Sequence, residues 1–245
     1  MASPAWLTAR PVAHRGLHGN GLLENTISAA LAAIDKGVAI ECDVQLTADG
    51  EAVVFHDFSL ERLTVGSGRL DALTAQALAT LAYRGSHDRI PTLAAFLDLI
   101  GGRVPLLVEI KSRFDGDLRL TQRVAEILNG RNAPVAVMSF DDEIVEALAT
   151  LTPDRPRGVV AEAEYHDHGP ARIDPARKTI LAGLMHVDRS KPDFIAWNVK
   201  NLPHPIPNFA RYFGMPVLTW TVRTAEDRQK AAGCADQMIF EGFVP

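Results

Sequence analysis

The chain has 245 residues, of which 47% are apolar and 22% are charged, and its formal net charge is −5. This composition excludes a disordered chain, and a mild negative charge without a basic block argues against a nucleic-acid partner. The length is typical of one (β/α)8 barrel, so we expect a single domain over residues 1–245.

Eight short apolar runs are predicted to be strands, beginning near residues 11, 38, 104, 134, 157, 193, 216 and 236. Helices are expected between them, at residues 24–36, 92–100, 118–129, 141–151, 175–184, 207–213 and 225–232. This alternation implies parallel strands joined by crossover helices. Eight repeats favour a closed α/β TIM barrel over an open doubly wound sheet, whose usual glycine-rich nucleotide motifs the sequence lacks.

One irregularity follows the second strand. Ala48-Asp49-Gly50 is a turn signal, and strand-like residues 52–55 come directly after it. We therefore predict a short hairpin insertion after the second strand, which adds one strand and delivers His56 to the end of the barrel.

The sequence shows neither the pattern of a membrane span nor that of a secretion signal. No run approaches the roughly 18 apolar residues of a membrane span, and residues 1–10 lack the basic start and apolar stretch of a signal peptide. We therefore expect a cytoplasmic protein, and its oligomeric state stays open. Cys42 and Cys234 are too few for a disulfide framework or a zinc site and are expected to be small core residues.

Ionisable residues stand where predicted strands end. His14 follows the first strand, Glu41 and Asp43 share one face of the second, and Glu109 and Lys111 share one face of the third. In a barrel of this type the pocket lies at the carboxyl ends of the strands, so these side chains should converge there.

Three converging carboxylates repel one another, and a divalent cation is the simplest way to keep them all ionised. Oxygen ligands favour Mg²⁺ or Ca²⁺ over zinc. The alternative is structural: Glu41, Asp43 and Glu109 would pair with Arg15 and Lys111 as a buried ion network.

His14 and His56 could serve as general acid and base on either side of a scissile bond, although a single histidine at a strand end is more often a hydrogen-bonded core residue. Arg15 directly follows His14, and its planar guanidinium suits a bidentate phosphate contact. Lys111 could neutralise another phosphate oxygen or form a salt bridge to Glu109 or Asp43.

Several short motifs together resemble the glycerophosphodiester phosphodiesterase family of phospholipase-C-like TIM barrels. The match is dense over about residues 12–112 and thin afterwards. The motifs are His14-Arg15-Gly16, Glu24-Asn25-Thr26, Glu41-x-Asp43-Val44, Thr47-x-Asp49-Gly50, Val53-Val54-x-His56-Asp57, Leu60-x-Arg62-Leu63-Thr64, Pro91-Thr92-Leu93, Glu109-Ile110-Lys111, Ser139-Phe140 and Thr219-Trp220-Thr221-Val222.

This resemblance implies a TIM-barrel hydrolase that uses one divalent cation, Mg²⁺ or Ca²⁺, to cleave small-molecule glycerophosphodiesters to glycerol 3-phosphate and an alcohol. Carried over by position, it gives His14 and His56 as the acid/base pair, Glu41, Asp43 and Glu109 as metal ligands, and Arg15 and Lys111 as the phosphate-binding cations. Trp220 would offer an apolar wall to the glycerol carbons, or would equally be a core residue capping the barrel.

Three departures from the family pattern affect the pocket wall. Leu23 and Arg223 stand where proline and asparagine are usual, and Glu241 and Gly242 lie within the stretch that usually reads Thr-Asp-x-Pro. These changes leave the proposed catalytic set intact and bear on the head group. Two rival functions remain: a phospholipase-type enzyme that forms a cyclic phosphate from a lipid, and a catalytically silent barrel that binds phosphodiesters.

The other histidines receive no catalytic role from the sequence. His166 and His168 imitate a metal-binding pair but are expected in a solvated loop after the fifth strand. The rest are expected to be structural or surface residues, namely His18, His87, His186 and His204. Asn25 or Thr26 most simply caps the first helix.

Overall fold

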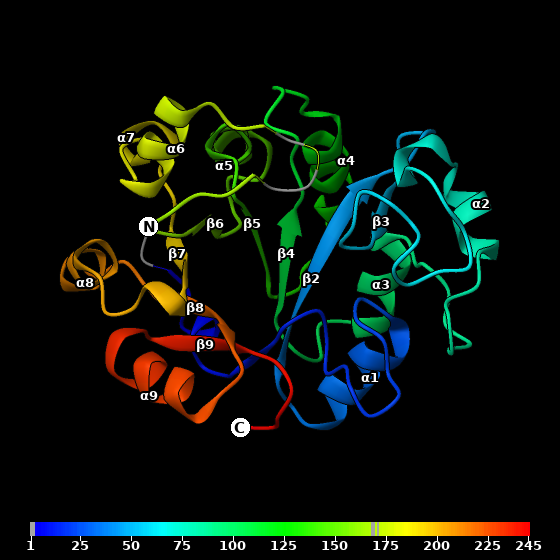
Figure 1. Cartoon of the computed structure of the whole chain (residues 1–245), viewed down its shortest axis with the longest axis horizontal. Coiled ribbons are helices and arrows are strands. Elements are labelled where there is room, and N and C mark those ends of the chain that lie inside the picture. The colour runs from blue at the N-terminus through cyan, green and yellow to red at the C-terminus, as the bar shows by residue number, and fades with distance from the viewer. Residues whose placement is uncertain (1–2, 168–169, 171) are drawn as a thin grey trace.

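The computed structural model describes residues 3–167, 170 and 172–245, and within this part of the chain eight parallel strands close into a barrel (Figure 1). Each strand lies where the sequence predicts one. The strands are β1 Val12–Ala13, β2 Ala39–Leu46, β4 Leu106–Ile110, β5 Val135–Ser139, β6 Arg157–Ala161, β7 Phe194–Asn198, β8 Val217–Val222 and β9 Gln237–Phe240. Their order around the barrel is β1-β9-β8-β7-β6-β5-β4-β2, and pairing of β1 with β2 closes it. The TIM-barrel prediction is confirmed.

Helices surround the barrel (Figure 1). The predicted helices correspond to α1 Ile27–Asp35, α3 Leu93–Ile100, α4 Arg119–Leu128, α5 Asp142–Leu151, α6 Pro175–Ala182, α8 Pro205–Tyr212 and α9 Ala225–Cys234. Five short helical segments were not predicted: α2 Ala75–Thr80, α7 Val187–Ser190 and the 3-10 helices η1 Ala5–Leu7, η2 Leu70–Ala72 and η3 Val199–Asn201. These segments are too short to show a helical hydrophobic period. None of the described helices has the length and apolar character needed to cross a membrane.

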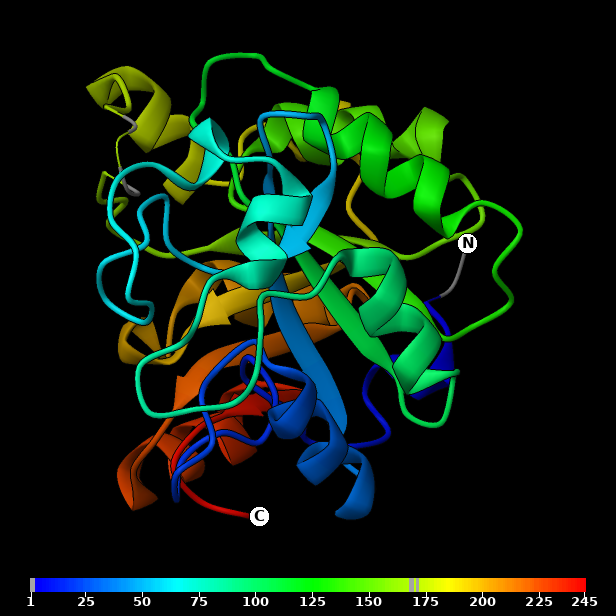
Figure 2. The same cartoon turned by 90° about the vertical axis from the view of Figure 1, so that its right-hand side faces the viewer.

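The predicted hairpin is present. Strand β3, Ala52–Val54, pairs antiparallel with β2, and Val54 lies opposite Val44. Residues 55–92 then run outside the barrel, with η2 and α2, before α3 begins (Figure 2). This insertion has a small core of its own, formed by Val53, Phe55, Leu60, Leu70, Leu78, Tyr83 and Ile90. The end of β3 is thereby held firmly beside the barrel opening.

Alternation along the strands divides the barrel into an inner and an outer face. On β2, Ile40 and Cys42 belong to the core between strands and helices, whereas Ala39 belongs to the inner cluster. Other members of the inner cluster are Val12, Leu107, Phe194, Leu218, Ile239 and, from η1, Leu7. Nearer the carboxyl end of β2, the inner positions become Glu41 and Asp43. The inside of the barrel is therefore apolar at its amino end and ionisable at its carboxyl end.

Close packing inside the barrel makes Gly158 a sensitive position. A Cβ added to Gly158 in β6 would lie 2.3 Å from two ring carbons of Phe194, which is fully buried. We expect Gly158→Ala to lower the free energy of unfolding by roughly 1–3 kcal/mol, because the ring and the strand must shift. Urea unfolding measures this. Gly233→Ala in α9 is the matched control, since an added Cβ there meets no atom of the described residues within 4 Å. An unchanged unfolding midpoint for Gly158→Ala would contradict the packing argument.

Candidate active site

Three carboxylates meet at the carboxyl end of the barrel. Glu41 and Asp43 extend from β2, Glu109 extends from β4, and Asp43 and Glu109 are partners across the two strands. One carboxylate oxygen of each lies within 4.8 Å of the others, and all three side chains are buried. The structure thus brings together the three residues that the resemblance implies as metal ligands.

Two cations contact these carboxylates. Lys111 Nζ lies 2.6 Å from Asp43 Oδ1 and 2.5 Å from Glu109 Oε1. Arg15 Nε lies 3.2 Å from Asp43 Oδ2, and the Arg15 guanidinium also donates to Glu24 at 2.7 Å. The ion pairs weighed as a structural alternative therefore exist, and they hold both cations directly beside the carboxylates.

Burial and neighbouring charge shift the pKa values of Glu41 and Asp43 in opposite directions. Burial raises the pKa of Glu41 well above its usual value, and the nearby Asp43 and Glu109 carboxylates raise it further. For Asp43 burial acts in the same direction, but the charges of Lys111 and Arg15 outweigh it and hold the pKa well below its usual value. Without a bound cation, burial and the neighbouring charges thus stabilise the protonated form of Glu41 relative to its carboxylate.

The loop after β1 is shaped around Glu41 and Asp43. Arg15 adopts a left-handed backbone with φ 56°, and its N–H donates to Glu41 Oε2 at 2.9 Å. Gly16 follows with φ 80°, and a Cβ there would lie 2.9 Å from the Cβ of Ala29. Only glycine allows the loop to pass this close to α1, which explains the His-Arg-Gly order.

His14 is held by a carboxylate from the opposite end of the chain. Its Nδ1 lies 2.8 Å from Glu241 Oε2, so Nδ1 donates to Glu241 when it carries the proton. Arg223 Nη2 also donates to this oxygen at 2.8 Å. The His14 Nε2 atom lies 4.0 Å from Glu41 Oε2 and so faces the carboxylate cluster. Burial lowers the pKa of His14, more than the Glu241 hydrogen bond raises it.

His56 is held in the same way. Its Nδ1 lies 2.7 Å from Asp57 Oδ1, and Asp57 accepts hydrogen bonds from Arg62. Arg62 in turn binds Glu24 through two N–H groups at 2.7 and 2.9 Å. Because each histidine uses Nδ1 to contact a carboxylate that an arginine also binds, each is left with Nε2 for other chemistry.

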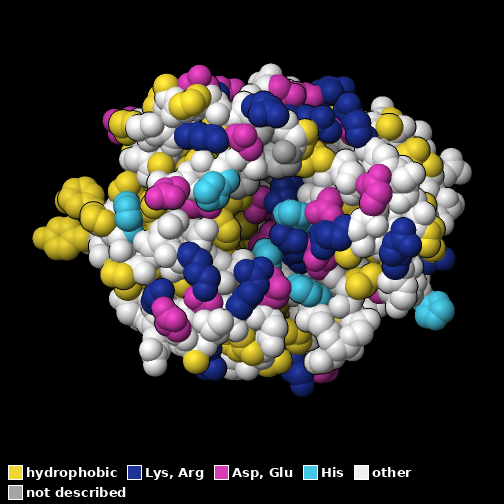
Figure 3. All heavy atoms as spheres, in the orientation of Figure 1, with side chains coloured by type: hydrophobic (Ala, Val, Ile, Leu, Met, Phe, Trp, Pro, Cys, Tyr) yellow, Lys and Arg dark blue, Asp and Glu magenta, His cyan; other side chains and the backbone are white. Residues whose placement is uncertain are grey.

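A cavity of about 470 Å³ opens beside these groups, and His56, Glu109 and Lys111 line it. Histidine, basic and acidic side chains gather around the hollow at the centre of this face (Figure 3). Phe140 also lines the cavity, and its ring lies edge-on to Trp220 with the centroids 5.4 Å apart. Trp220 itself is half-buried and donates Nε1–H to the carbonyl of Ala196 at 2.7 Å. Trp220 therefore packs against Phe140, which lines the cavity.

Asn25 and Glu241 are among the residues that hold site groups and were not expected from the sequence. Asn25 is fully buried and donates Nδ2–H to Asp43 Oδ2 at 2.8 Å, while Thr26 caps α1, so the cap and the site contact belong to different residues. Glu241 holds His14. Both had a usable signal: Asn25 lies within the Glu24-Asn25-Thr26 motif, and Glu241 directly follows the last predicted strand, where site residues of a barrel are expected.

The histidines set aside by the sequence analysis fall into two groups. His166 lies in the loop after β6, where its backbone N–H donates to Glu162 at 3.2 Å, and the adjacent Asp167 pairs with Lys178. His168 lies outside the described residues. His18, in contrast, lies next to the site, with Nε2 at 3.9 Å from Glu241 Oε2. From the sequence, His18 was expected to be a structural or surface residue. Its position beside the site was not predictable, because residue 18 lies in an irregular loop.

Fold and pocket together define the class: a closed (β/α)8 barrel with ionisable side chains at the carboxyl ends of its strands has the architecture of TIM-barrel enzymes. The model of the glycerophosphoryl diester phosphodiesterase family matches residues 14–239. The chain therefore belongs to the glycerophosphoryl diester phosphodiesterase family.

Individual relatives agree with this assignment. YhdW of Bacillus subtilis (strain 168), which is provisionally named a glycerophosphodiester phosphodiesterase, is 33% identical over 95% of this chain and 92% of its own length. A glycerophosphodiester phosphodiesterase of the same organism is 26% identical over 95% of this chain and 83% of its own length. Both likenesses span nearly the whole barrel.

Solved structures show the same fold. An Oleispira antarctica phosphodiesterase in complex with the product sn-glycerol-3-phosphate superposes with a TM-score of 0.79 at 22% identity, over 94% of this chain and 91% of that one. The glycerophosphodiester phosphodiesterase of Thermotoga maritima gives a TM-score of 0.74 at 22% identity, over 94% of both chains.

Proposed function

We propose that this chain is a single-domain, metal-dependent phosphodiesterase that hydrolyses glycerophosphodiesters to glycerol 3-phosphate and an alcohol. Membership in the family supports the reaction class, and the product bound to the Oleispira antarctica relative supports the glycerol 3-phosphate moiety. The single observation that carries the proposal is the convergence of Glu41, Asp43 and Glu109 beside Lys111 and Arg15 at the pocket.

The carboxylate cluster suits one hard divalent cation, Mg²⁺ or Ca²⁺. Its donors are all oxygens, and Glu41 Oε1 is buried without a hydrogen-bond partner among the described residues. Glu41, Asp43 and Glu109 would hold the ion. When bound, it would act as a Lewis acid on a phosphoryl oxygen. Lys111 and Arg15 are positioned by the same carboxylates. These two cations would neutralise the charge that builds on the other phosphate oxygens.

The histidines would move the protons. His14 Nε2 faces the carboxylate cluster, and His56 lines the pocket. Each is oriented through Nδ1 by a carboxylate, Glu241 or Asp57. We propose that one histidine takes a proton from the attacking water and the other gives a proton to the leaving alcohol oxygen. Trp220 and its neighbour Phe140 would form the apolar wall against substrate carbons.

The test is release of glycerol 3-phosphate from glycerophosphocholine and glycerophosphoethanolamine by the purified protein in EDTA, Mg²⁺ or Ca²⁺. We expect release only with a divalent ion, because three buried carboxylates hold the reacting phosphate poorly without one. A cyclic phosphodiester product, or turnover of intact phospholipid vesicles, would instead indicate the phospholipase-type reaction. Tight binding without turnover under every ion would indicate a silent barrel. Full activity in EDTA would contradict the metal requirement.

A further inference from the structure

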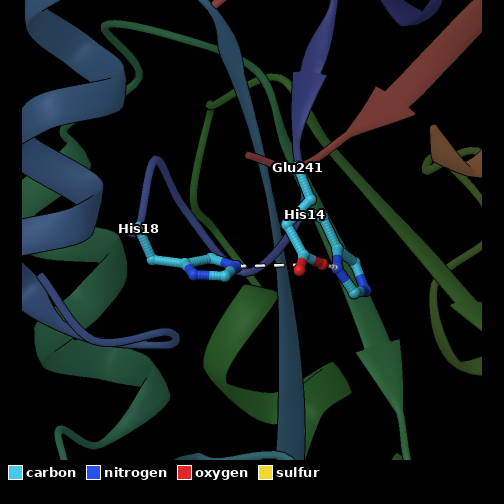
Figure 4. Close-up of side chains that lie close together, drawn as sticks. All are labelled: His14, His18 and Glu241. Carbon is cyan, nitrogen blue, oxygen red and sulfur yellow. Dashed lines mark hydrogen bonds and ion pairs between the residues drawn. The ribbon is translucent and has the colours of Figure 1, made fainter. Parts of the chain in front are cut away.

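A second group of potential metal ligands lies beside the carboxylate cluster and shares no residue with it. His14, His18 and Glu241 each offer one ligand atom, and these atoms all lie within 4.8 Å of one another. The Glu241 carboxylate lies between the two imidazole rings, which come from opposite sides (Figure 4). Its Oε2 is 2.8 Å from His14 Nδ1 and 3.9 Å from His18 Nε2.

Two features indicate that this group can take a ligand. The Nε2 atom of His18 is buried and has no hydrogen-bond partner among the described residues, although it faces Glu241. The three side chains are largely but not fully enclosed, with exposures of 13%, 18% and 23% for His14, His18 and Glu241. An ion can therefore reach them from solvent, and a buried nitrogen would gain a partner.

The chemistry of the donors favours a borderline transition metal such as zinc over Mg²⁺ or Ca²⁺. Two imidazole nitrogens and one carboxylate oxygen are the ligand set of a zinc site that keeps a fourth position open, whereas Mg²⁺ and Ca²⁺ prefer oxygen. Zinc-bound nitrogens at 2.0–2.1 Å place tetrahedral ligand atoms roughly 3.3 Å apart, so the observed separations require only small side-chain rotations. The neighbouring all-oxygen cluster keeps the opposite preference.

We propose that His14, His18 and Glu241 form a second site that binds Zn²⁺ or a similar borderline transition metal, and that this ion inhibits the enzyme. The inhibitory part rests on the proposed function, because it assigns His14 to proton transfer. The metal-binding part stands on geometry alone. Glu241, which directly follows β9, and His18, in the loop after β1, carry the site in this chain, and the Glu241 carboxylate lies between the two rings.

Inhibition follows from which nitrogen the ion would occupy. In the ion-free protein Nδ1 of His14 contacts Glu241, which leaves the Nε2 lone pair able to accept a proton. A metal at Nδ1 displaces that proton, and neutral His14 then carries its one N–H at Nε2. His14 can then no longer accept a proton toward the pocket, and to donate one it would have to give up its last N–H proton and become an imidazolate, so it serves neither as base nor as acid. Arg223 competes with the ion for Glu241, but its side chain is 52% exposed and can turn into solvent.

The test separates binding from inhibition. Co²⁺ and Zn²⁺ are titrated into the protein in saturating Mg²⁺, with visible absorption of Co²⁺ and calorimetry of Zn²⁺ as readouts that need no turnover. We expect one Zn²⁺ or Co²⁺ bound per chain, tetrahedral Co²⁺ absorption, and loss of phosphodiesterase activity at the same concentrations. His18→Ala should weaken binding and raise the inhibitory concentration by roughly 10- to 100-fold while basal activity stays near wild type. His87→Ala, at an exposed position, is the matched control.

Three results would overturn the proposal. Equal Zn²⁺ affinity in the wild type and His18→Ala would place the ion elsewhere. Zn²⁺ binding that Mg²⁺ abolishes would place it at the carboxylate cluster. The third result concerns inhibition alone. If the wild type binds Zn²⁺ at this site, as shown by loss of the Co²⁺ signal in His18→Ala, and still hydrolyses its substrate at the normal rate, the inhibitory role is refuted. If the protein hydrolyses no glycerophosphodiester at all, the spectra still decide the metal site, so the two proposals fail independently.

Discussion

Replacing His56 by alanine is expected to lower the rate of glycerophosphodiester hydrolysis roughly 10²- to 10⁴-fold, the range for loss of a general acid or base. His56 lines the pocket, and its orientation is set by Asp57, which Arg62 also binds. The same loss is expected for His14→Ala, because His14 Nε2 faces the carboxylate cluster. The fall should appear in kcat, since proton transfer belongs to the transition state rather than to substrate binding.

Steady-state kinetics of both variants measure this effect, with His87→Ala as the exposed control and urea unfolding to verify the fold. Loss of two groups that act together is not additive, so the double variant should fall little below the slower single variant. Near-normal turnover of either single variant would remove that histidine from the mechanism. Unfolding of a variant would point instead to the core role that a lone strand-end histidine often has.

Replacing Glu41 by glutamine is expected to abolish metal-dependent activity while leaving the ion-free fold intact. Glutamine has nearly the same shape as glutamate but no charge, so it should weaken Mg²⁺ or Ca²⁺ binding. Loss of a residue that only supports a metal ligand lowers metal affinity by up to about 10²-fold, and loss of a ligand itself should cost at least as much. Ion-free Glu41 already favours its neutral form, because burial and the Asp43 and Glu109 charges raise its pKa. The substitution therefore removes little from the protein without metal.

The raised pKa of Glu41 also predicts how the stability of the protein depends on pH. A carboxyl group whose folded pKa is raised contributes stability fully below its unfolded pKa, and this contribution is lost as the pH rises through the folded pKa. Ion-free wild-type protein should thus lose stability with rising pH in this window, and Glu41→Gln should lose less. Metal binding must displace the Glu41 proton, so binding should release protons and tighten as the pH rises toward that pKa.

Calorimetry in buffers of different ionisation enthalpy counts the released protons, and unfolding in EDTA at several pH values gives the stability. Glu143→Gln, a half-exposed glutamate in an ion pair with Arg177, is a suitable control outside the carboxylate cluster. Metal affinity unchanged in Glu41→Gln would remove this residue from the metal site. A large loss of stability in EDTA would show that Glu41 is a structural anion rather than a metal ligand.

The sequence by itself determined the architecture. Eight apolar runs alternating with helices specify a (β/α)8 barrel, because each parallel strand must be buried and must return through a crossover helix. The strict two-residue period of a strand also placed Glu41 with Asp43 and Glu109 with Lys111 on the inner face. The hairpin that precedes His56 was readable for the same reason, since Asp49-Gly50 is a turn signal between two apolar runs.

Only the tertiary structure decided which partners hold those residues. Glu241 contacts His14 across 227 positions of sequence, because closure of the barrel brings β9 beside β1. Asn25 contacts Asp43, and His18 approaches Glu241, through a loop with left-handed residues whose path no periodic pattern describes. The two-residue period of a strand shows which face a residue occupies. Hydrogen bonds between distant segments depend instead on barrel closure and loop geometry, which are set by the packing of the whole chain.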